Sequence, residues 1–306
     1  MFTLFSLFFV TIAIIESMAG LLGNGTILAV SSTSCIRRKI FSSYDMIMIF
    51  LSLSRFFLQS WMMLDLFVNL LCETSYYEEN LFAIFKAVFM FLNNSSLWFA
   101  AWLSVFYCTK VASFSQSFFI WLKQRISSLV PWMLLTSSFF SFATSLPFAW
   151  DVYNVHKNFT APSSVTNSSE KRVTMKASWF LFILLCNAGV TLPLIVFVVS
   201  SILLIRSLWI HTRQMQNNAT GFKDPSLVAH TDAIKSLFSF FILYVTYFIC
   251  LILNLCDIFS PLSVEEAICV TVMAACPAGH SIILIWSNPK FRELPARILH
   301  QLSCQN

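Results

Sequence analysis

Seven long apolar runs constrain this chain more than any other feature of its sequence. They span about residues 4–30, 44–70, 82–108, 128–150, 178–205, 234–256 and 265–286. Each is long enough for an α-helix to cross the hydrocarbon core of a bilayer, which takes about 20 residues. The short connections predict antiparallel neighbours. We therefore expect an all-α membrane protein, a single domain of 306 residues built as a seven-transmembrane helical bundle.

Composition supports the membrane assignment. The chain is 58% hydrophobic and only 11% charged, whereas about a quarter of the residues of a soluble domain are charged. The first run follows Met1 without a basic segment and is about twice as long as the apolar core of a signal peptide. We interpret it as a retained helix.

The orientation of the bundle is predicted from the Lys and Arg residues that flank the runs, because cytoplasmic connections are enriched in them. Most lie on one side: Arg37, Arg38, Lys39, Lys110, Lys123, Arg125, Arg206, Arg213, Lys223, Lys235, Lys290, Arg292 and Arg297. This places the N-terminus outside the cell and a tail, residues 287–306, in the cytoplasm. The net charge of +5 then reflects topology and anionic membrane lipid rather than a nucleic-acid partner.

The connection at 151–177 is expected to be an extracellular loop. It contains two glycosylation triplets, which begin at Asn158 and Asn167. Both fall on the predicted outer side, where glycans are added. Triplets that begin at Asn24, Asn94 and Asn218 fall in spans or in the cytoplasm, so we do not expect them to be used.

Motifs for catalysis or metal binding are absent from the sequence. There is no CxxC pair, Cys/His ligand spacing, HExxH, GxSxG or glycine-rich phosphate loop among the 306 residues. We therefore expect no enzymatic activity, no metal and no cofactor. The sequence leaves the oligomeric state open.

Several segments carry a more specific signature. The second run contains LSLSR, ending at Arg55, and the third inner connection reads DPSLVAHTDAIKS, residues 224–236. The last run contains PAGHSIILI, with His280 and Ser281 at its centre. Together these segments resemble the type 2 taste receptors, the bitter taste receptor family of G-protein-coupled receptors. The resemblance extends from Glu16 to Arg292, and the DRY and NPxxY motifs of rhodopsin-like receptors are absent.

The resemblance implies a receptor in the plasma membrane. It would bind bitter small molecules in a pocket on the extracellular side and activate a gustducin-type heterotrimeric G protein. A vomeronasal-type pheromone receptor shares the architecture and is one alternative. A small-molecule transporter is another, but it predicts inverted repeats and ion ligands at the membrane midplane, which the sequence lacks.

The polar sequence Asn93-Asn94-Ser95-Ser96 interrupts the third run. Helical spacing puts Phe89, Met90 and Asn93 on one stripe, and the resemblance implies that they face the ligand. An interhelical hydrogen bond is the alternative role for Asn93. We expect Ser95 and Ser96 to bond back to the preceding turn.

Three further positions complete the expected pocket. The resemblance places Tyr244 and Tyr247 at its floor, with a structural aromatic stripe as the alternative. It places Val270 at pocket level, where an apolar side chain offers no ionic anchor. Asp65 could attract a cationic amine ligand, or it could pair with Lys86 or face water.

Arg55 lies in the middle of a span and must find polar partners there. The resemblance groups it with Asn24, His280 and Ser281 in a polar core that rearranges on activation. A static structural clasp is the alternative.

The cytoplasmic ends are expected to contact the G protein. The candidate contacts are Tyr107, Lys110, His211, Met215, His230 and Lys235. Each basic residue could instead serve only to fix the topology.

Overall fold

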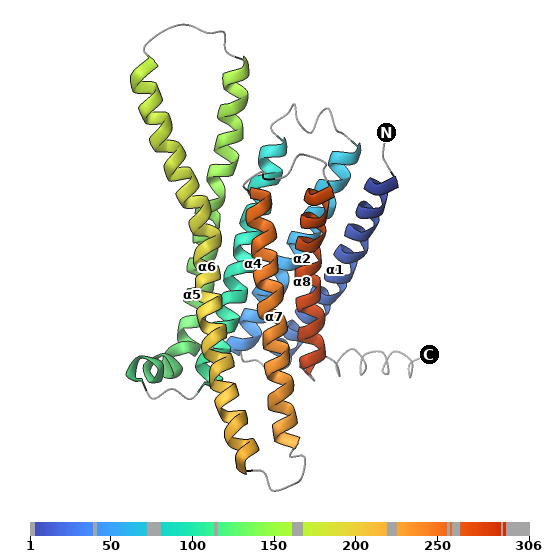
Figure 1. The fold of residues 1–306 in the computed structure, drawn as a ribbon, viewed down its shortest axis with the longest axis vertical. Helices are drawn as coiled ribbons and strands as arrows, with labels where there is room; N and C mark the ends of the chain where they lie inside the picture. Colours follow the sequence, from blue (N-terminus) through green and yellow to red (C-terminus); the bar gives the residue numbers. More distant parts are fainter. Residues whose placement is uncertain are drawn as a thin grey trace.

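The computed structural model describes residues 4–38, 42–71, 81–112, 116–160, 168–218, 225–255, 258, 264–288 and 290–291. Within them the chain forms seven helices and no strand (Figure 1). These are α1 (Leu4–Arg38), α2 (Ser43–Leu71), α4 (Leu81–Val111), α5 (Ser117–Thr160), α6 (Ser168–Asn218), α7 (Pro225–Leu255) and α8 (Val264–Ser287). Each overlaps one predicted run and is long and apolar enough to cross a membrane. The predicted seven-helix fold is confirmed.

Several helices are longer than the apolar runs. Helices α5 and α6 continue into the segment expected as a loop at 151–177, and Figure 1 shows them projecting beyond their neighbours. No Gly or Pro occurs from Asp151 to Thr160, and α5 ends two residues before Pro162. Because a residue that precedes proline disfavours helical backbone, the end of α5 fits this position. The side chains of Asn158 and Asn167 lie outside the described residues.

Helix α4 is the most buried of the spans. In an 18-residue apolar stretch of α4, 67% is buried inside the bundle. The corresponding share is 28% in α1, α5 and α7. It packs on α2, α5 and α6, while α8 packs on α1 and α7. Met90, Ala101, Leu134, Val190 and Leu251 lie in the shared apolar core. Residues 93–97 of α4 are all buried, so none of them faces lipid.

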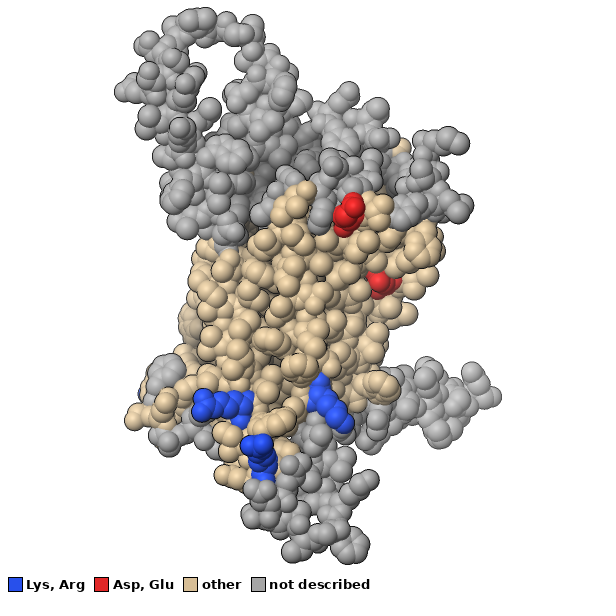
Figure 2. All heavy atoms as spheres, in the orientation of Figure 1, with Lys and Arg blue, Asp and Glu red and all other residues tan. Residues whose placement is uncertain are grey.

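The two ends of the bundle differ in charge. On the face shown in Figure 2, Lys and Arg gather at one end, while Asp and Glu lie towards the other. We call the end at which α1 and α4 have their last residues the basic end; Lys110 lies in the last turn of α4. Leu4, the first residue of α1, lies at the opposite end. This asymmetry agrees with the charge pattern from which the orientation was predicted.

Candidate signalling core and comparisons with known proteins

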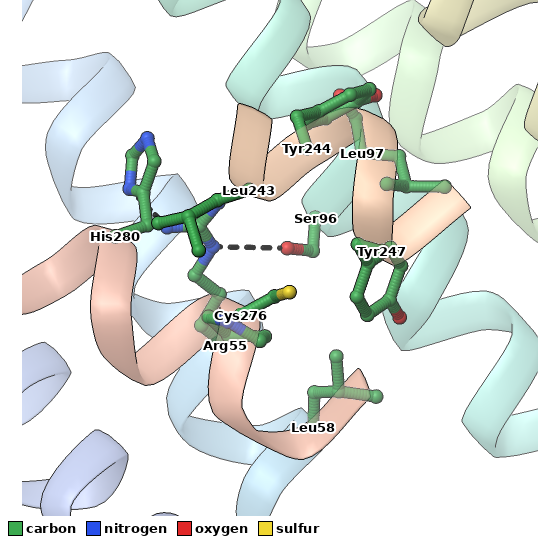
Figure 3. Close-up of a pocket in the computed structure, with 10 residues that line it drawn as sticks. Arg55, Leu58, Ser96, Leu97, Leu243, Tyr244, Tyr247, Cys276 and His280 are labelled. Atoms are coloured by element: carbon green, nitrogen blue, oxygen red, sulfur yellow. Dashed lines mark hydrogen bonds between the residues drawn. The ribbon is translucent and has the colours of Figure 1, made fainter. Parts of the chain in front are cut away.

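A small cavity lies between α2, α4, α7 and α8 near the middle of the bundle (Figure 3). Its volume is about 30 Å³, which is the space that the centre of a water molecule can occupy. Its lining consists of Arg55, Leu58, Ser96, Leu97, Leu243, Tyr244, Tyr247, Cys276, Pro277 and His280. A water molecule needs about 10–15 Å³ on this measure. The cavity therefore has room for about two or three water-sized particles and for no drug-sized ligand.

Arg55 is the charged residue of this cavity, and its side chain is buried between three helices. Its Nε donates to Ser96 Oγ of α4 over 3.2 Å, as Figure 3 shows. Its Nη1 contacts Nδ1 of His280 on α8 at 2.5 Å. A guanidinium can only donate, so Nδ1 of His280 must accept. His280 is therefore neutral and carries its proton on Nε2.

Asn24 and Ser281 form a second polar contact, between α1 and α8. Ser281 Oγ donates to Asn24 Oδ1 over 2.7 Å, and both side chains are buried. The four residues expected in the activation core therefore pair as Arg55 with His280 and Asn24 with Ser281. Ser96, which we expected to bond back along its own helix, instead accepts the hydrogen bond from Arg55.

Two tyrosines of α7 reach across the bundle to α4. Tyr247 Oη donates to Asn93 Oδ1, and Tyr244 Oη donates to the carbonyl oxygen of Leu97 over 3.2 Å. The ring of Tyr244 also stacks on Phe197 of α6 with centroids 3.9 Å apart. Asn93 therefore makes the interhelical hydrogen bond that was one of its two predicted roles. Its amide Nδ2 has no partner among the described residues.

The residues expected to bind ligand do not all meet at the cavity. Tyr244 and Tyr247 line it, whereas Phe89, Met90, Asn93, Asp65 and Val270 do not. Asn93 and Met90 are fully buried in α4, and Phe89 is half-buried one turn further from the basic end. Asp65 is half-buried in α2, and Val270 of α8 is exposed.

Sequence reasoning missed several interhelical contacts. Asn94 Nδ2 donates to Thr144 Oγ1 of α5 over 3.1 Å, and Ser104 of α4 bonds with Ser200 and Ser201 of α6. Gln59 of α2 is fully buried and packs on Gly20 of α1. Buried polar residues in apolar runs were the available signal, but a run does not show which neighbouring helix they meet.

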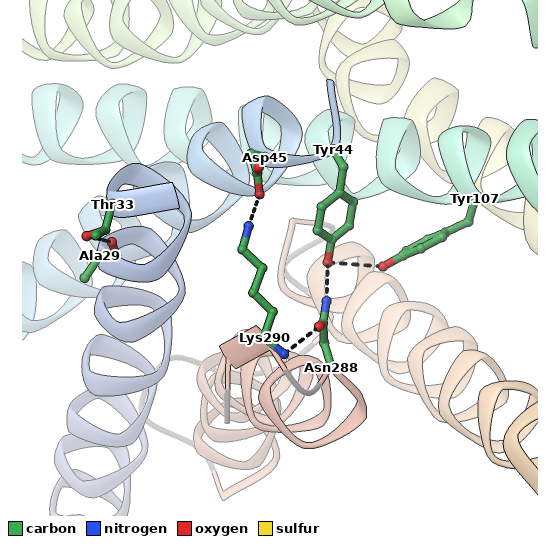
Figure 4. Close-up of polar contacts among 7 residues, drawn as sticks. All are labelled: Ala29, Thr33, Tyr44, Asp45, Tyr107, Asn288 and Lys290. Carbon is green, nitrogen blue, oxygen red and sulfur yellow. Dashed lines mark hydrogen bonds and ion pairs between the residues drawn. The ribbon is translucent and has the colours of Figure 1, made fainter. Parts of the chain in front are cut away.

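A second group of polar contacts lies near the basic end (Figure 4). The hydroxyl of Tyr44 on α2 accepts from Tyr107 Oη of α4 over 3.3 Å and from Asn288 Nδ2, just after α8, over 3.1 Å. Beside it, Lys290 forms an ion pair with the buried Asp45 of α2. We call these five residues the basic-end lock, since they tie α2 to α4 and to the end of α8.

The other residues expected to contact a G protein lie near this end. Lys110 is exposed, and its Nζ donates to Ser127 Oγ of α5 over 3.5 Å. His211 is half-buried on α6, and Lys235 is exposed on α7. Met215 and His230 lie in α6 and α7, but their side chains are outside the described residues.

Comparison with known proteins identifies the fold family. A model of the taste receptor protein family, TAS2R, matches residues 1–303. Taste receptor type 2 member 40 of Gallus gallus is 69% identical over 99% of this chain and 97% of its own length. The chain belongs to the taste receptor type 2 family.

More distant members of the family agree. Taste receptor type 2 member 39 of Papio hamadryas is 41% identical over 94% of this chain and 85% of the relative. Taste receptor type 2 member 39 of Homo sapiens is 40% identical over 92% of this chain and 83% of the relative. The resemblance drawn from the sequence motifs is thus confirmed, and the chain is a multi-pass G-protein-coupled taste receptor. Because the family is one of taste receptors, the transporter and pheromone-receptor alternatives are set aside.

Proposed function

We propose that this receptor binds bitter small molecules in the half of the bundle away from the basic end and activates a gustducin-type heterotrimeric G protein at the basic end. The basic end then faces the cytoplasm of a cell whose plasma membrane holds the receptor. The observation that carries this proposal is the chain of polar contacts from α4 and α7 through Arg55 and His280 to α8.

Asn93 supports the position of the ligand site. It lies one helical turn from Leu97, on the side of the cavity away from the basic end. Its unpartnered Nδ2 can donate to a ligand. Aromatic and apolar neighbours such as Phe89 and Met90 suit a largely apolar tastant.

The basic-end lock supports the position of the output. A G-protein α-subunit helix needs a groove between the cytoplasmic helix ends. Here Tyr44, Tyr107 and Asn288 bond across that space, so the lock holds the end closed. An agonist with higher affinity for the state in which these contacts are broken shifts the population towards that open state by its difference in affinity for the two states.

Calcium imaging tests the proposal in cells that express the chain with a taste G-protein α-subunit. We expect several members of a bitter panel to raise calcium, and Asn93→Ala to lower agonist potency about tenfold, the result of losing about 1.4 kcal/mol of binding. Asn94→Ala is the matched control because Asn94 bonds to Thr144 instead. A receptor that reaches the cell surface yet responds to no bitter compound contradicts the proposal.

A further inference from the structure

The guanidinium of Arg55 has more donors than the protein supplies acceptors. A guanidinium carries five N–H donors and no acceptor. In the described part of the chain only Nε and Nη1 of Arg55 have hydrogen-bond partners, Ser96 and His280. The side chain is 5% exposed. The remaining N–H groups therefore have no protein acceptor within hydrogen-bond distance in the described part of the chain.

The positive charge of Arg55 also has no carboxylate beside it. Its two contacts are a hydroxyl and a neutral imidazole, and the described residues include no ion pair of Arg55. Asp45 pairs with Lys290 at the basic end. An uncompensated charge buried in a low-dielectric interior is unfavourable, and a counter-ion relieves this.

The cavity beside Arg55 is suited to a small anion. Its polar lining includes the Ser96 hydroxyl, which accepts from Arg55 and makes no described donation of its own. Leu58, Leu97 and Leu243 supply apolar wall (Figure 3), beside Tyr244, Tyr247, Cys276, Pro277 and His280. Its volume of about 30 Å³ has room for a monatomic ion but not for a tastant.

We propose that this cavity binds one halide-sized anion, chloride under physiological conditions, on the guanidinium of Arg55 and the hydroxyl of Ser96. Water in the same space would satisfy the N–H groups but leave the charge uncompensated. Because the anion bridges α2 and α4 next to the α8 contact, it stabilises the arrangement of helices described above. This inference goes beyond the proposed function and does not depend on it.

Thermal unfolding of the purified full-length receptor in detergent micelles tests the site. The midpoint is measured while sodium chloride or sodium bromide replaces sodium gluconate at constant ionic strength. An anion that binds only the folded state stabilises it by RT ln(1 + [L]/Kd), so the midpoint rises with the logarithm of the anion concentration once this exceeds Kd. We expect this rise with both halides, and no rise when acetate, which is larger, replaces gluconate.

Two variants of the site and one control variant localise the effect. Arg55→Gln removes the charge and should abolish the halide-dependent rise, while Arg206→Gln, at an exposed position of α6, should retain it. Ser96→Ala keeps the charge and removes one donor, so it should require severalfold more chloride to reach the same rise in midpoint as the wild type. This variant decides the matter if Arg55→Gln does not fold.

Three results would overturn the proposal. They are equal midpoints of the wild type in chloride and gluconate, an acetate effect as large as that of chloride, or an unchanged chloride dependence in Ser96→Ala or folded Arg55→Gln. None of these measurements involves an agonist or a G protein. The anion site can therefore be disproved while the proposed function stands, and the reverse also holds.

Discussion

At the scale of single residues, the hydroxyl of Tyr247 joins α7 to α4 through Asn93. We predict that Tyr247→Phe and Asn93→Ala are energetically coupled, since each removes one half of the same buried bond. Interhelical bonds in membranes contribute about 0.6 kcal/mol on average and up to about 1.7. A double-mutant cycle on thermal unfolding of the purified receptor measures the coupling.

Tyr244→Phe is the matched control for that cycle. The hydroxyl of Tyr244 donates to the backbone carbonyl of Leu97 rather than to Asn93, so its effect should add to that of Asn93→Ala. Additivity in the Tyr247 cycle, or equal coupling in both cycles, would show that the Tyr247–Asn93 contact does not join the helices.

The residue scale also shows what the sequence could and could not predict. A charged residue in an apolar run must find polar partners, so Arg55 was identifiable as a residue that needs them, and the resemblance grouped it with a polar core. Its contact with Ser96 was not, because a serine in a helix can bond to its own preceding turn or to a neighbour. Only the rotation of α4 about its axis decides between these, and helical spacing within one run does not determine that rotation.

At the scale of helices, α6 approaches the contact between α4 and α5 at Gly189. A Cβ on Gly189 would lie 2.8 Å from Asn94 Nδ2 and 2.9 Å from Thr144 Oγ1. We therefore predict that Gly189→Ala lowers the free energy of unfolding by about 1–3 kcal/mol, the usual cost of overpacking. Thermal unfolding in detergent measures this change.

Gly25→Ala provides the comparison. There the nearest atom, Phe56 Cε2, would lie 3.7 Å from the new Cβ, an ordinary contact. Alanine is favoured over glycine inside a helix by up to about 1 kcal/mol, so this variant should be as stable as the wild type or more so. If both alanine variants behave alike, close packing of α6 on α4 and α5 is not what requires Gly189.

The basic-end lock yields a prediction about signalling. Tyr44→Phe removes the acceptor used by both Tyr107 and Asn288. Because each neutral hydrogen bond contributes about 0.5–1.5 kcal/mol, the loss should favour the open state severalfold. We expect a rise in agonist-independent G-protein activation, normalised to surface expression.

Thr33→Val is the control for this variant. The hydroxyl of Thr33 bonds to the Ala29 carbonyl within α1 (Figure 4), so its removal breaks no contact between helices. Basal activity of Tyr44→Phe equal to that of Thr33→Val and of the wild type would contradict the role assigned to the lock.

The limits of the helices were harder to predict than their existence. The apolar runs mark where hydrocarbon surrounds a helix, and all seven were found. Three helices continue into polar sequence: α5 ends at Thr160, α6 begins at Ser168 and α7 begins at Pro225. There hydropathy gives no signal, and only breakers such as Pro162 indicate an end.

At the scale of the whole molecule, the predicted orientation can be tested through its glycosylation triplets. If the basic end is cytoplasmic, Asn158 and Asn167 are exposed to the glycosylation machinery. We predict that glycosidase treatment increases the electrophoretic mobility of the receptor and that the double variant Asn158→Gln/Asn167→Gln loses this shift. Asn218→Gln, beside the basic end, should keep it. If the mobility shift were lost only in Asn218→Gln, the basic end would be extracellular and the predicted orientation would be wrong.

The central claim is that occupancy of one end of the bundle is coupled to the other end. Binding linkage requires that, if agonist favours the G-protein-bound state, the G protein raises agonist affinity by the same factor. The direct measurement is the affinity of a bitter agonist for the receptor in nanodiscs with and without nucleotide-free G protein. We predict an increase of about 5–150-fold with the G protein. Equal affinities in the two conditions, with the G protein shown to be bound, would contradict the account.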